Sequence, residues 1–348
     1  MENIELIQKL SNAFGVSGDE REIAEILREE IKGDVEKIKS DAMGNLIAMK
    51  GLDKSGFKVM LNAHMDEVGL IVTFIDEKGF LSFKKVGGID DRVLLGKRVI
   101  VGESKIKGII GAKAIHLQKK KDEVEKTVES DIMTIDIGAK NKEEAEKFAP
   151  LGSLVAFDTK FEKLNEKYYI GKAFDDRLGC SIVASLLKYS FNFPVIALFS
   201  TQEEIGLRGA ITGAYQYTPD MSITVEGTIS ADIPEVKEHL KCSKIGQGPV
   251  ITIKDRTLIT DHKLREKLIY TAKRQNIPYQ FKQVIAGGTD SSKIQLTKSG
   301  VRVLTVAVPV RYIHSPVSLF YQDDYENTLK LLYEFLNSLK EEYYGTVN

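Results

Sequence analysis

Residues 70–167 differ in texture from the sequence on either side of them, and this difference limits the folds that the chain can adopt. Short runs of alternating polar and apolar residues separated by glycines, such as GFLSFKKVGG and GKRVIVGESKIKGIIGAK, are typical of β-strands and turns. One short helix is expected around KNKEEAEKF. The segment is therefore predicted to form a small all-β domain, a barrel or a sandwich, inserted into a larger domain.

Helices and strands alternate in the two flanking segments, residues 1–69 and 168–348. Strands are predicted at the apolar runs NLIAMKG, FKVMLNAHMDEVGLIVTFI, PVIALFS, SITVEG and VRVLTVAV. Helices are predicted around RLGCSIVASLLKYS and DHKLREKLIYTAKRQ, and a final amphipathic helix places on one core-facing stripe Leu329, Leu332, Leu336 and Leu339. This order predicts an α/β domain with a mixed or parallel sheet covered by helices, divided in sequence by the all-β insert.

The segment GVSGDEREIAEILREEIKG carries the signals of a complete helix. Ser17 is expected to cap its first turn, with Glu20 reciprocating three residues later, as in a capping box. Ile23, Leu27 and Ile31 then form one apolar face.

The amino-acid composition indicates which kinds of binding partner to expect. The 348 residues are 43% hydrophobic, which predicts a sizeable core, and the 49 basic and 50 acidic side chains nearly cancel. No net field therefore points to nucleic acid or to an anionic membrane, and a small or neutral partner is expected. The charge run LQKKKDEVEKTVESD is interpreted as a solvated loop or hairpin.

Signals for export are missing from the sequence. The first residues lack a basic region followed by an apolar run, and no stretch approaches the roughly 20 apolar residues of a membrane helix. Cys180 and Cys242 are too few for a disulfide framework. These features favour a cytoplasmic protein.

Polar clusters follow apolar strands or stand at the start of helices in several places. They are AHMDEVG, GKAFDDRLG, TQEEIG, VEGT, GGTDS and YIHSP. In sheets of this kind the loops at the carboxyl ends of strands converge on a site, so these clusters are expected to meet.

The ligand types in these clusters suit zinc or a similar divalent ion, because they offer imidazole nitrogens and carboxylate oxygens without a thiolate. A carboxylate can also bridge two ions about 3.5 to 4 Å apart, an arrangement that activates water. Asp66 can in addition accept a hydrogen bond from the far ring nitrogen of His64 and fix its tautomer.

Each signal has a simpler interpretation when it is taken alone. His116, His239 and His262 are treated as structural or surface histidines, Asp175 and Asp176 could form only a helix N-cap, and GGTDS could be only a turn. The prediction depends on the conjunction of the clusters. Phosphate-binding glycine motifs, a G-x-S-x-G elbow and H-E-x-x-H are all missing from the sequence.

Taken together, AHMDEVG, AFDDRLGC, QEEIGLRGA, VEGTISADIP, GGTDSSKI and PVRYIHSP resemble a known family. It is the family of dinuclear metallo-aminopeptidases that includes the tetrahedral aminopeptidases, glutamyl aminopeptidase and proteins labelled cellulase M. The resemblance covers essentially the whole chain. It implies a zinc-peptidase α/β domain, residues 1–69 and 168–348, with a PDZ-like or barrel insert, residues 70–167, that serves dimer contacts. It also implies homodimers that assemble into a homododecamer.

The same resemblance implies the ligands of two divalent ions, zinc or cobalt. One ion would be held by His64, Asp175 and Glu226, and the other by Asp175, Glu204 and His314. Asp175 would bridge the ions through a carboxylate whose residue is joined to Asp176 by a cis peptide bond. Many relatives place Asp where this chain has Glu226.

The catalytic roles follow in the same way. Glu203 would be the general base and Asp66 would orient His64. A water activated by the two metals would attack the scissile carbonyl of a short peptide with a free N-terminal amine. The pocket for the N-terminal residue is expected from GPVITIKDRTL and residues 286–291, with Gly288 and Asp290 as substrate-binding residues. The preferred N-terminal residue stays open.

Two other functions are considered beside the aminopeptidase. A glycoside hydrolase of the endoglucanase type would use two carboxyl groups and usually an aromatic platform, but this chain has no tryptophan and carries two histidines among the clusters. A non-catalytic oligomeric scaffold would not require every ligand type to be present. The sequence therefore favours a metal-dependent aminopeptidase.

Overall fold

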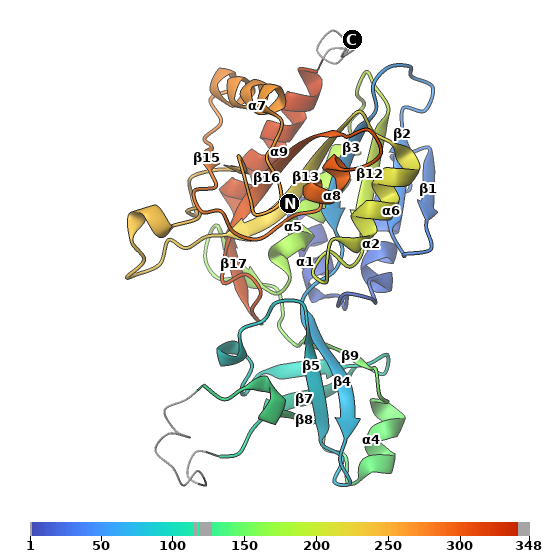
Figure 1. Cartoon of the computed structure of the whole chain (residues 1–348), viewed down its shortest axis with the longest axis vertical. Coiled ribbons are helices and arrows are strands. Elements are labelled where there is room, and N and C mark those ends of the chain that lie inside the picture. The colour runs from blue at the N-terminus through green and yellow to red at the C-terminus, as the bar shows by residue number, and fades with distance from the viewer. Residues whose placement is uncertain (1, 115–116, 118–126, 340–348) are drawn as a thin grey trace.

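A large mixed sheet and a separate closed barrel organise the chain in the computed structural model, which describes residues 2–114, 117 and 127–339 (Figure 1). The sheet and its helices form the upper part of the molecule in Figure 1, and the barrel forms the lower part. No helix among these residues has both the length and the apolar character needed to cross a membrane.

The large sheet contains 11 strands. Its main path runs through β1 (Lys37–Ser40), β2 (Leu46–Lys50), β12 (Val195–Ser200), β3 (Val59–His64), β13 (Met221–Ile229), β16 (Arg302–Arg311), β17 (Ser318–Tyr321), β11 (Tyr168–Gly171) and β10 (Glu162–Lys163). Beside this path, β14 (Val250–Ile251) pairs with β16 and with β15 (Gln280–Phe281). The four strands from β12 to β16 are parallel, so their carboxyl ends meet at one edge of the sheet.

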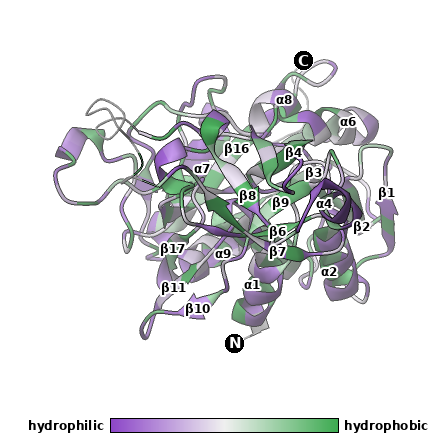
Figure 2. Ribbon diagram, turned by 90° about the horizontal axis from the view of Figure 1, so that it is seen from below, coloured by the Kyte–Doolittle hydropathy of each residue, from purple (hydrophilic) through white to green (hydrophobic). Residues whose placement is uncertain are grey.

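Helices cover both faces of this sheet, because the central strands are apolar on both sides. Ala197 belongs to one hydrophobic core with α1 (Glu2–Asn12), α2 (Arg21–Ile31), α5 (Phe174–Leu186), α7 (His262–Arg274) and α9 (Gln322–Asn337). Its neighbours Ile196 and Leu198 belong to another core with α6 (Arg208–Tyr217) and α8 (Ser291–Gln295). Successive strand residues thus enter opposite cores. Figure 2 shows β16 as mainly hydrophobic and the edge strand β1 as mainly hydrophilic.

The barrel is closed by six strands around its own apolar core. In spatial order they are β4 (Gly69–Ile75), β5 (Leu81–Val86), β8 (Thr134–Asp136), β7 (Ile106–Gly111), β6 (Arg98–Val101) and β9 (Leu154–Phe157). The helix α4 (Lys142–Phe148) follows β8. Three short 3₁₀ helices complete the described elements: η1 (Asp91–Val93) and η3 (Ser130–Ile132) beside the barrel, and η4 (Glu238–Leu240) after β13.

The predicted fold class, a mixed α/β sheet flanked by helices with an all-β insert, is confirmed. The predicted insert, residues 70–167, contains the barrel strands apart from Gly69, and it also contains β10, which pairs with β11 in the large sheet. The division into two domains at these boundaries stays a prediction. The charge run LQKKKDEVEKTVESD and His116 lie largely outside the described residues.

Two local predictions differ from the structure. The run FKVMLNAHMDEVGLIVTFI forms two strands instead of one, because β3 enters the large sheet and β4 starts the barrel. The capping box is also wrong. The helix α2 begins after Glu20, whose side chain makes no capping hydrogen bond, and Ser17 donates its hydroxyl to Asp66 at 2.5 Å.

Candidate metal centre

The polar clusters converge on one pocket at the carboxyl edge of the parallel strands. His64 is the last residue of β3, Glu203 and Glu204 follow β12, and Glu226 lies in β13. Asp175 in the first turn of α5 and His314, which follows β16, complete the group. All six side chains line a pocket of about 330 Å³. The parallel pairing of β12, β3 and β13 explains this convergence.

Asp175 lies between the two histidines. Its Oδ1 atom is 3.3 Å from Nε2 of His64, and its Oδ2 atom is 3.4 Å from Nε2 of His314. Each histidine also faces a second carboxylate: Glu226 Oε2 is 3.6 Å from His64 Nε2, and Glu204 Oε1 is 3.2 Å from His314 Nε2. The five side chains thus form two neighbouring groups that share Asp175.

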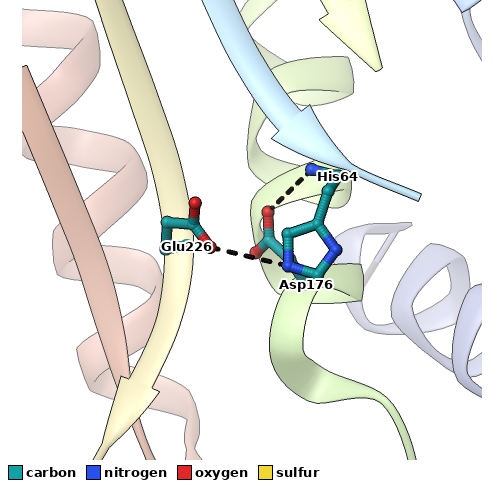
Figure 3. A group of neighbouring side chains, drawn as sticks. All are labelled: His64, Asp176 and Glu226. Atoms are coloured by element: carbon teal, nitrogen blue, oxygen red, sulfur yellow. Dashed lines mark hydrogen bonds and ion pairs between the residues drawn. The ribbon is translucent and has the colours of Figure 1, made fainter. Parts of the chain in front are cut away.

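The two aspartates at the start of α5 have different surroundings, although a cis peptide bond joins them. Asp176 accepts a hydrogen bond from the backbone N–H of Gly179 at 2.9 Å and another from that of His64 at 3.2 Å. Figure 3 shows Asp176 of α5 and Glu226 of β13 on two sides of His64 of β3, each joined to His64 by a dashed line. A methyl group on Gly179 would lie only 2.3 Å from Asp176. Asp176 therefore has the N-cap character that the sequence allowed, and Asp175 is left to face the pocket.

Both histidines are oriented through Nδ1. In His64 this atom lies 3.2 Å from the backbone oxygen of Asp66 and 3.4 Å from its Oδ1 atom. In His314 it lies 3.0 Å from the backbone oxygen of Gly88, which belongs to the segment between β5 and η1. Donation from Nδ1 leaves the lone pair of Nε2 directed toward the carboxylates, which is the tautomer that a metal ligand requires.

Burial and mutual charge shift the pKa values of these groups. Burial raises the pKa of Glu203, Glu204 and Glu226. Burial acts in the same direction on Asp175, but hydrogen bonds with His314 and His64 outweigh it and lower its pKa. For His314 burial acts to lower the pKa, whereas Asp175 and Glu204 raise it to about 11. The buried carboxylates therefore favour positive charge in this pocket, which a divalent ion can supply.

The side chains of this cluster fit divalent cations. Oε1 of Glu226 is buried and has no hydrogen-bond partner among the described residues, and Oε2 of the same carboxylate faces His64. An unpaired buried carboxylate oxygen is costly unless a cation neutralises it. The donors are imidazole nitrogens and carboxylate oxygens, the set preferred by zinc and similar ions.

The remaining residues predicted for the site lie in different places. Gly288 lines the pocket, whereas Asp290 is fully buried, is not among the lining residues, and accepts a hydrogen bond from Ser200. Asp66 is also fully buried and contacts His64 rather than the pocket. His239 and His262, treated above as structural, do not line the pocket either.

Sequence reasoning did not single out Lys282, which follows β15 and lines the pocket. No motif marks it, because β15 has only two residues and Lys282 lies in the loop that follows them. Thr252, within the loop GPVITIKDRTL, lines the pocket as that loop was expected to do. The pocket wall thus combines an anticipated loop with a cation that was not anticipated.

Known proteins resemble this chain in both sequence and fold. The M42 glutamyl aminopeptidase family model matches residues 44–331. A protein of Acetivibrio thermocellus named as an aminopeptidase is 41% identical over 333 residues, 95% of this chain and 97% of the relative. The TET aminopeptidase of a marine sediment Thaumarchaeota archaeon has a TM-score of 0.94 and 34% identity, covering 98% of this chain and 97% of that one.

A further solved structure is the TET1 peptidase of Pyrococcus horikoshii, which can assemble into a tetrahedron or a large octahedral shell. It has a TM-score of 0.86 and 34% identity, covering 97% of this chain and all of that chain (100%). Since the family model spans most of the sequence and these likenesses extend over nearly its whole length, this chain belongs to the M42 glutamyl aminopeptidase family.

Proposed function

We propose that this metal-dependent aminopeptidase removes the N-terminal residue of short peptides at a centre for two divalent ions, zinc or cobalt. The observation that carries the proposal is the position of Asp175, whose two oxygens face Nε2 of His64 and Nε2 of His314. One ion is assigned to His64, Asp175 and Glu226. The other is assigned to Asp175, Glu204 and His314.

The chemistry that divalent ions supply in such a centre is polarisation of the scissile carbonyl and a lowered pKa of water. The protein supplies the proton transfer. Glu203 lines the same pocket and lies beside the ligand Glu204, so we assign it as the general base. It accepts the proton of the attacking water and gives it to the amine of the leaving peptide.

Asp66 acts through other residues in this proposal. Its contacts with Nδ1 of His64 hold the ring with Nε2 toward Asp175 and Glu226. Its Oδ1 atom also accepts the backbone N–H of Glu203 at 2.9 Å. The buried carboxylate of Asp66 therefore contacts both the proposed ligand His64 and the backbone of the proposed base Glu203.

The pocket also supports a preference for the side chain of the N-terminal residue. Lys282 is the one lysine or arginine among the described residues that line it. Apart from the carboxylates and histidines assigned to the centre, the other lining side chains are uncharged, such as Thr252 and Thr228. A cation in a confined pocket attracts an acidic side chain and repels a basic one. We therefore propose that N-terminal glutamate and aspartate are favoured over lysine and arginine.

A homo-oligomer of barrel-linked dimers is proposed as the working assembly, with a homododecamer as its final form. Its support is the likeness to the P. horikoshii peptidase and a set of exposed apolar side chains on the barrel segment. They are Phe74, Leu95, Ile109, Ile132, Phe148 and Leu151. Cys180 and Cys242 are free and buried, which is compatible with the proposed cytoplasmic location.

The test of the function compares peptide and polysaccharide substrates before and after metal removal. Protein stripped by a chelator should not cleave aminoacyl anilides, and addition of zinc or cobalt should restore cleavage. Carboxymethylcellulose should remain uncut in every sample. Hydrolysis of cellulose that survives chelation, with peptides untouched, would show that the proposal is wrong.

A further inference from the structure

Four consecutive backbone N–H groups follow β12, and each donates a hydrogen bond to a side chain from elsewhere in the chain. Thr201 donates to Oδ1 of Asn45 at 2.9 Å, and Gln202 donates to Oε1 of Glu20 at 3.1 Å. Glu203 and Glu204 donate to the two oxygens of Asp66, at 2.9 and 3.1 Å. Side chains from other parts of the chain thus hold this segment, which carries the proposed base and a proposed ligand, through its backbone N–H groups.

This segment lacks the support of regular secondary structure. It leaves the sheet at Ser200, and Gln202 has a φ of +56°, a left-handed conformation that costs free energy for a residue with a side chain. Buried N–H groups require partners, and the side chains of Asn45, Glu20 and Asp66 provide them. All three of these residues are buried, so water competes poorly for the same hydrogen bonds.

Glu20 belongs to a part of the chain far from the segment in sequence. Its carbonyl oxygen accepts the N–H of Ala24 in the first turn of α2, and its Oε1 atom also accepts the N–H of Gly18 at 2.8 Å. Its carboxylate is therefore anchored to a helix and a turn. The backbone N–H of Gln202 donates to this same carboxylate.

Ser17 makes the second connection from the same turn. Its hydroxyl donates to Oδ2 of Asp66 at 2.5 Å, the oxygen that also accepts the N–H of Glu204. Its own N–H donates to the backbone oxygen of Glu67 at 3.2 Å. The turn before α2 thus contacts both sides of the segment, directly through Glu20 and by way of Asp66 through Ser17.

We propose that Glu20, together with Ser17, is a positioning residue that fixes Glu203 and Glu204 at the metal centre, an inference that rests on the roles proposed above. Neither residue is among those that line the pocket. Their effect passes through the backbone of Gln202 and through Asp66. A displacement of about 1 Å in a catalytic group can cost roughly a hundredfold in rate, so this attachment should affect turnover more than substrate binding.

The test uses side chains of similar size at position 20. Glu20→Met removes the acceptor, Glu20→Gln keeps a carbonyl oxygen for the N–H of Gln202, and Glu25→Ala changes an exposed glutamate of the same helix as a control. Glu20→Met should lower kcat by roughly tenfold or more while KM changes less than about threefold. Glu20→Gln should recover most of kcat, and Glu25→Ala should match the wild type.

Amide hydrogen exchange supplies a readout that does not need activity. In Glu20→Met the amides of residues 201–204 should exchange faster, whereas those of β12 and β13 should keep their wild-type rates. Wild-type kcat in folded Glu20→Met, or an equal loss of kcat in Glu20→Met and Glu20→Gln, would overturn the proposal.

A second variant covers failure of Glu20→Met to fold. Ser17→Ala removes the hydroxyl that reaches Asp66, and it should speed exchange at residues 203–204 and lower kcat with little change in KM. Unchanged exchange there would overturn the proposal. Inactivity of the wild type on every aminoacyl substrate would instead contradict the proposed function, and the exchange result would still decide the attachment.

Discussion

Oδ2 of Asp175 lies 3.4 Å from Nε2 of His314, on the opposite side of the carboxylate from His64. Among the described residues, Asp175 is the one carboxylate that lies within 4.0 Å of a ring nitrogen of both pocket histidines. Loss of this carboxylate should affect both groups of ligands, whereas loss of a ligand at one end should affect only one.

Asp175→Asn should therefore lose both metal ions, whereas His314→Ala should keep one. Asparagine offers a single neutral oxygen, so it cannot balance the charge of two ions. Metal content per chain, measured by mass spectrometry after gel filtration, checks this prediction. Asp176→Asn is the comparison variant and should keep both ions, because both oxygens of Asp176 already accept backbone hydrogen bonds. Two ions retained in Asp175→Asn would contradict the shared ligand.

The neighbouring glutamates should behave differently from each other. Glu203→Gln should bind both ions and lose most of its turnover, by roughly a hundredfold or more, because the glutamine amide cannot accept the proton of water. Glu204→Gln should instead lose metal from the group that contains His314. Metal content and kcat measured on the same samples separate the two outcomes. Equal metal content with equal loss of activity would refute the division of roles.

Much of this site could be predicted because strand ends are visible in sequence. His64 and Glu203 follow apolar runs, and the parallel order of the strands then brings them to one edge. The contacts of Ser17 and Glu20 could not be predicted from strand ends. Their S-x-x-E spacing fits a local capping box, whereas their true partners are Asp66 and Gln202, 49 and 182 residues away.

The helix α6 and the pocket residue Lys282 were not predicted from the sequence, and each has a physical reason. The buried face of α6 consists of Gly209, Ala210, Gly213 and Ala214, so the helix has no stripe of large apolar residues to reveal its period. Small residues are required there, since a methyl group on Gly209 would lie 2.3 Å from Asn45. The pocket residue Lys282 was missed because it follows a two-residue strand whose pairing is not local.

Reversal of the charge at Lys282 should reverse the preference for the N-terminal residue. Lys282→Glu should lower kcat/KM for glutamyl anilide relative to lysyl anilide by roughly tenfold or more, because like charges in a pocket cost several kcal/mol when they are desolvated. Lys254→Glu is the matched control, since Lys254 is exposed and does not line the pocket. A ratio that Lys282→Glu leaves within a factor of two of the wild type would exclude Lys282 as the origin of selectivity.

Stability should depend on pH through Asp324, which is remote from the metal centre. Its two oxygens accept the backbone N–H groups of Gly246 and Gly248, at 2.6 and 2.7 Å. Burial raises its pKa from an ordinary value of 3.8 to about 6, even though these hydrogen bonds act in the opposite direction. The folded protein thus holds the proton more tightly than the unfolded chain does.

The contribution of Asp324 to stability should therefore be full below pH 3.8, fall as the pH rises through 6, and stay constant above that value. The gap between the two pKa values corresponds to about 3 kcal/mol. Asp324→Asn cannot titrate, so the free energy of unfolding of the wild type minus that of Asp324→Asn should decrease by this order between pH 4 and pH 7. Urea unfolding at several pH values provides the measurement.

The adjacent Asp323 supplies a control with the opposite sign. A hydrogen bond from Lys167 lowers the pKa of Asp323, so its contribution to stability is present above pH 3.8 and is lost only as the pH falls through the lowered value. The corresponding difference for Asp323→Asn should not decrease between pH 4 and pH 7. If both variants give the same trend with pH, then burial of Asp324 does not control the pH dependence of stability in this range.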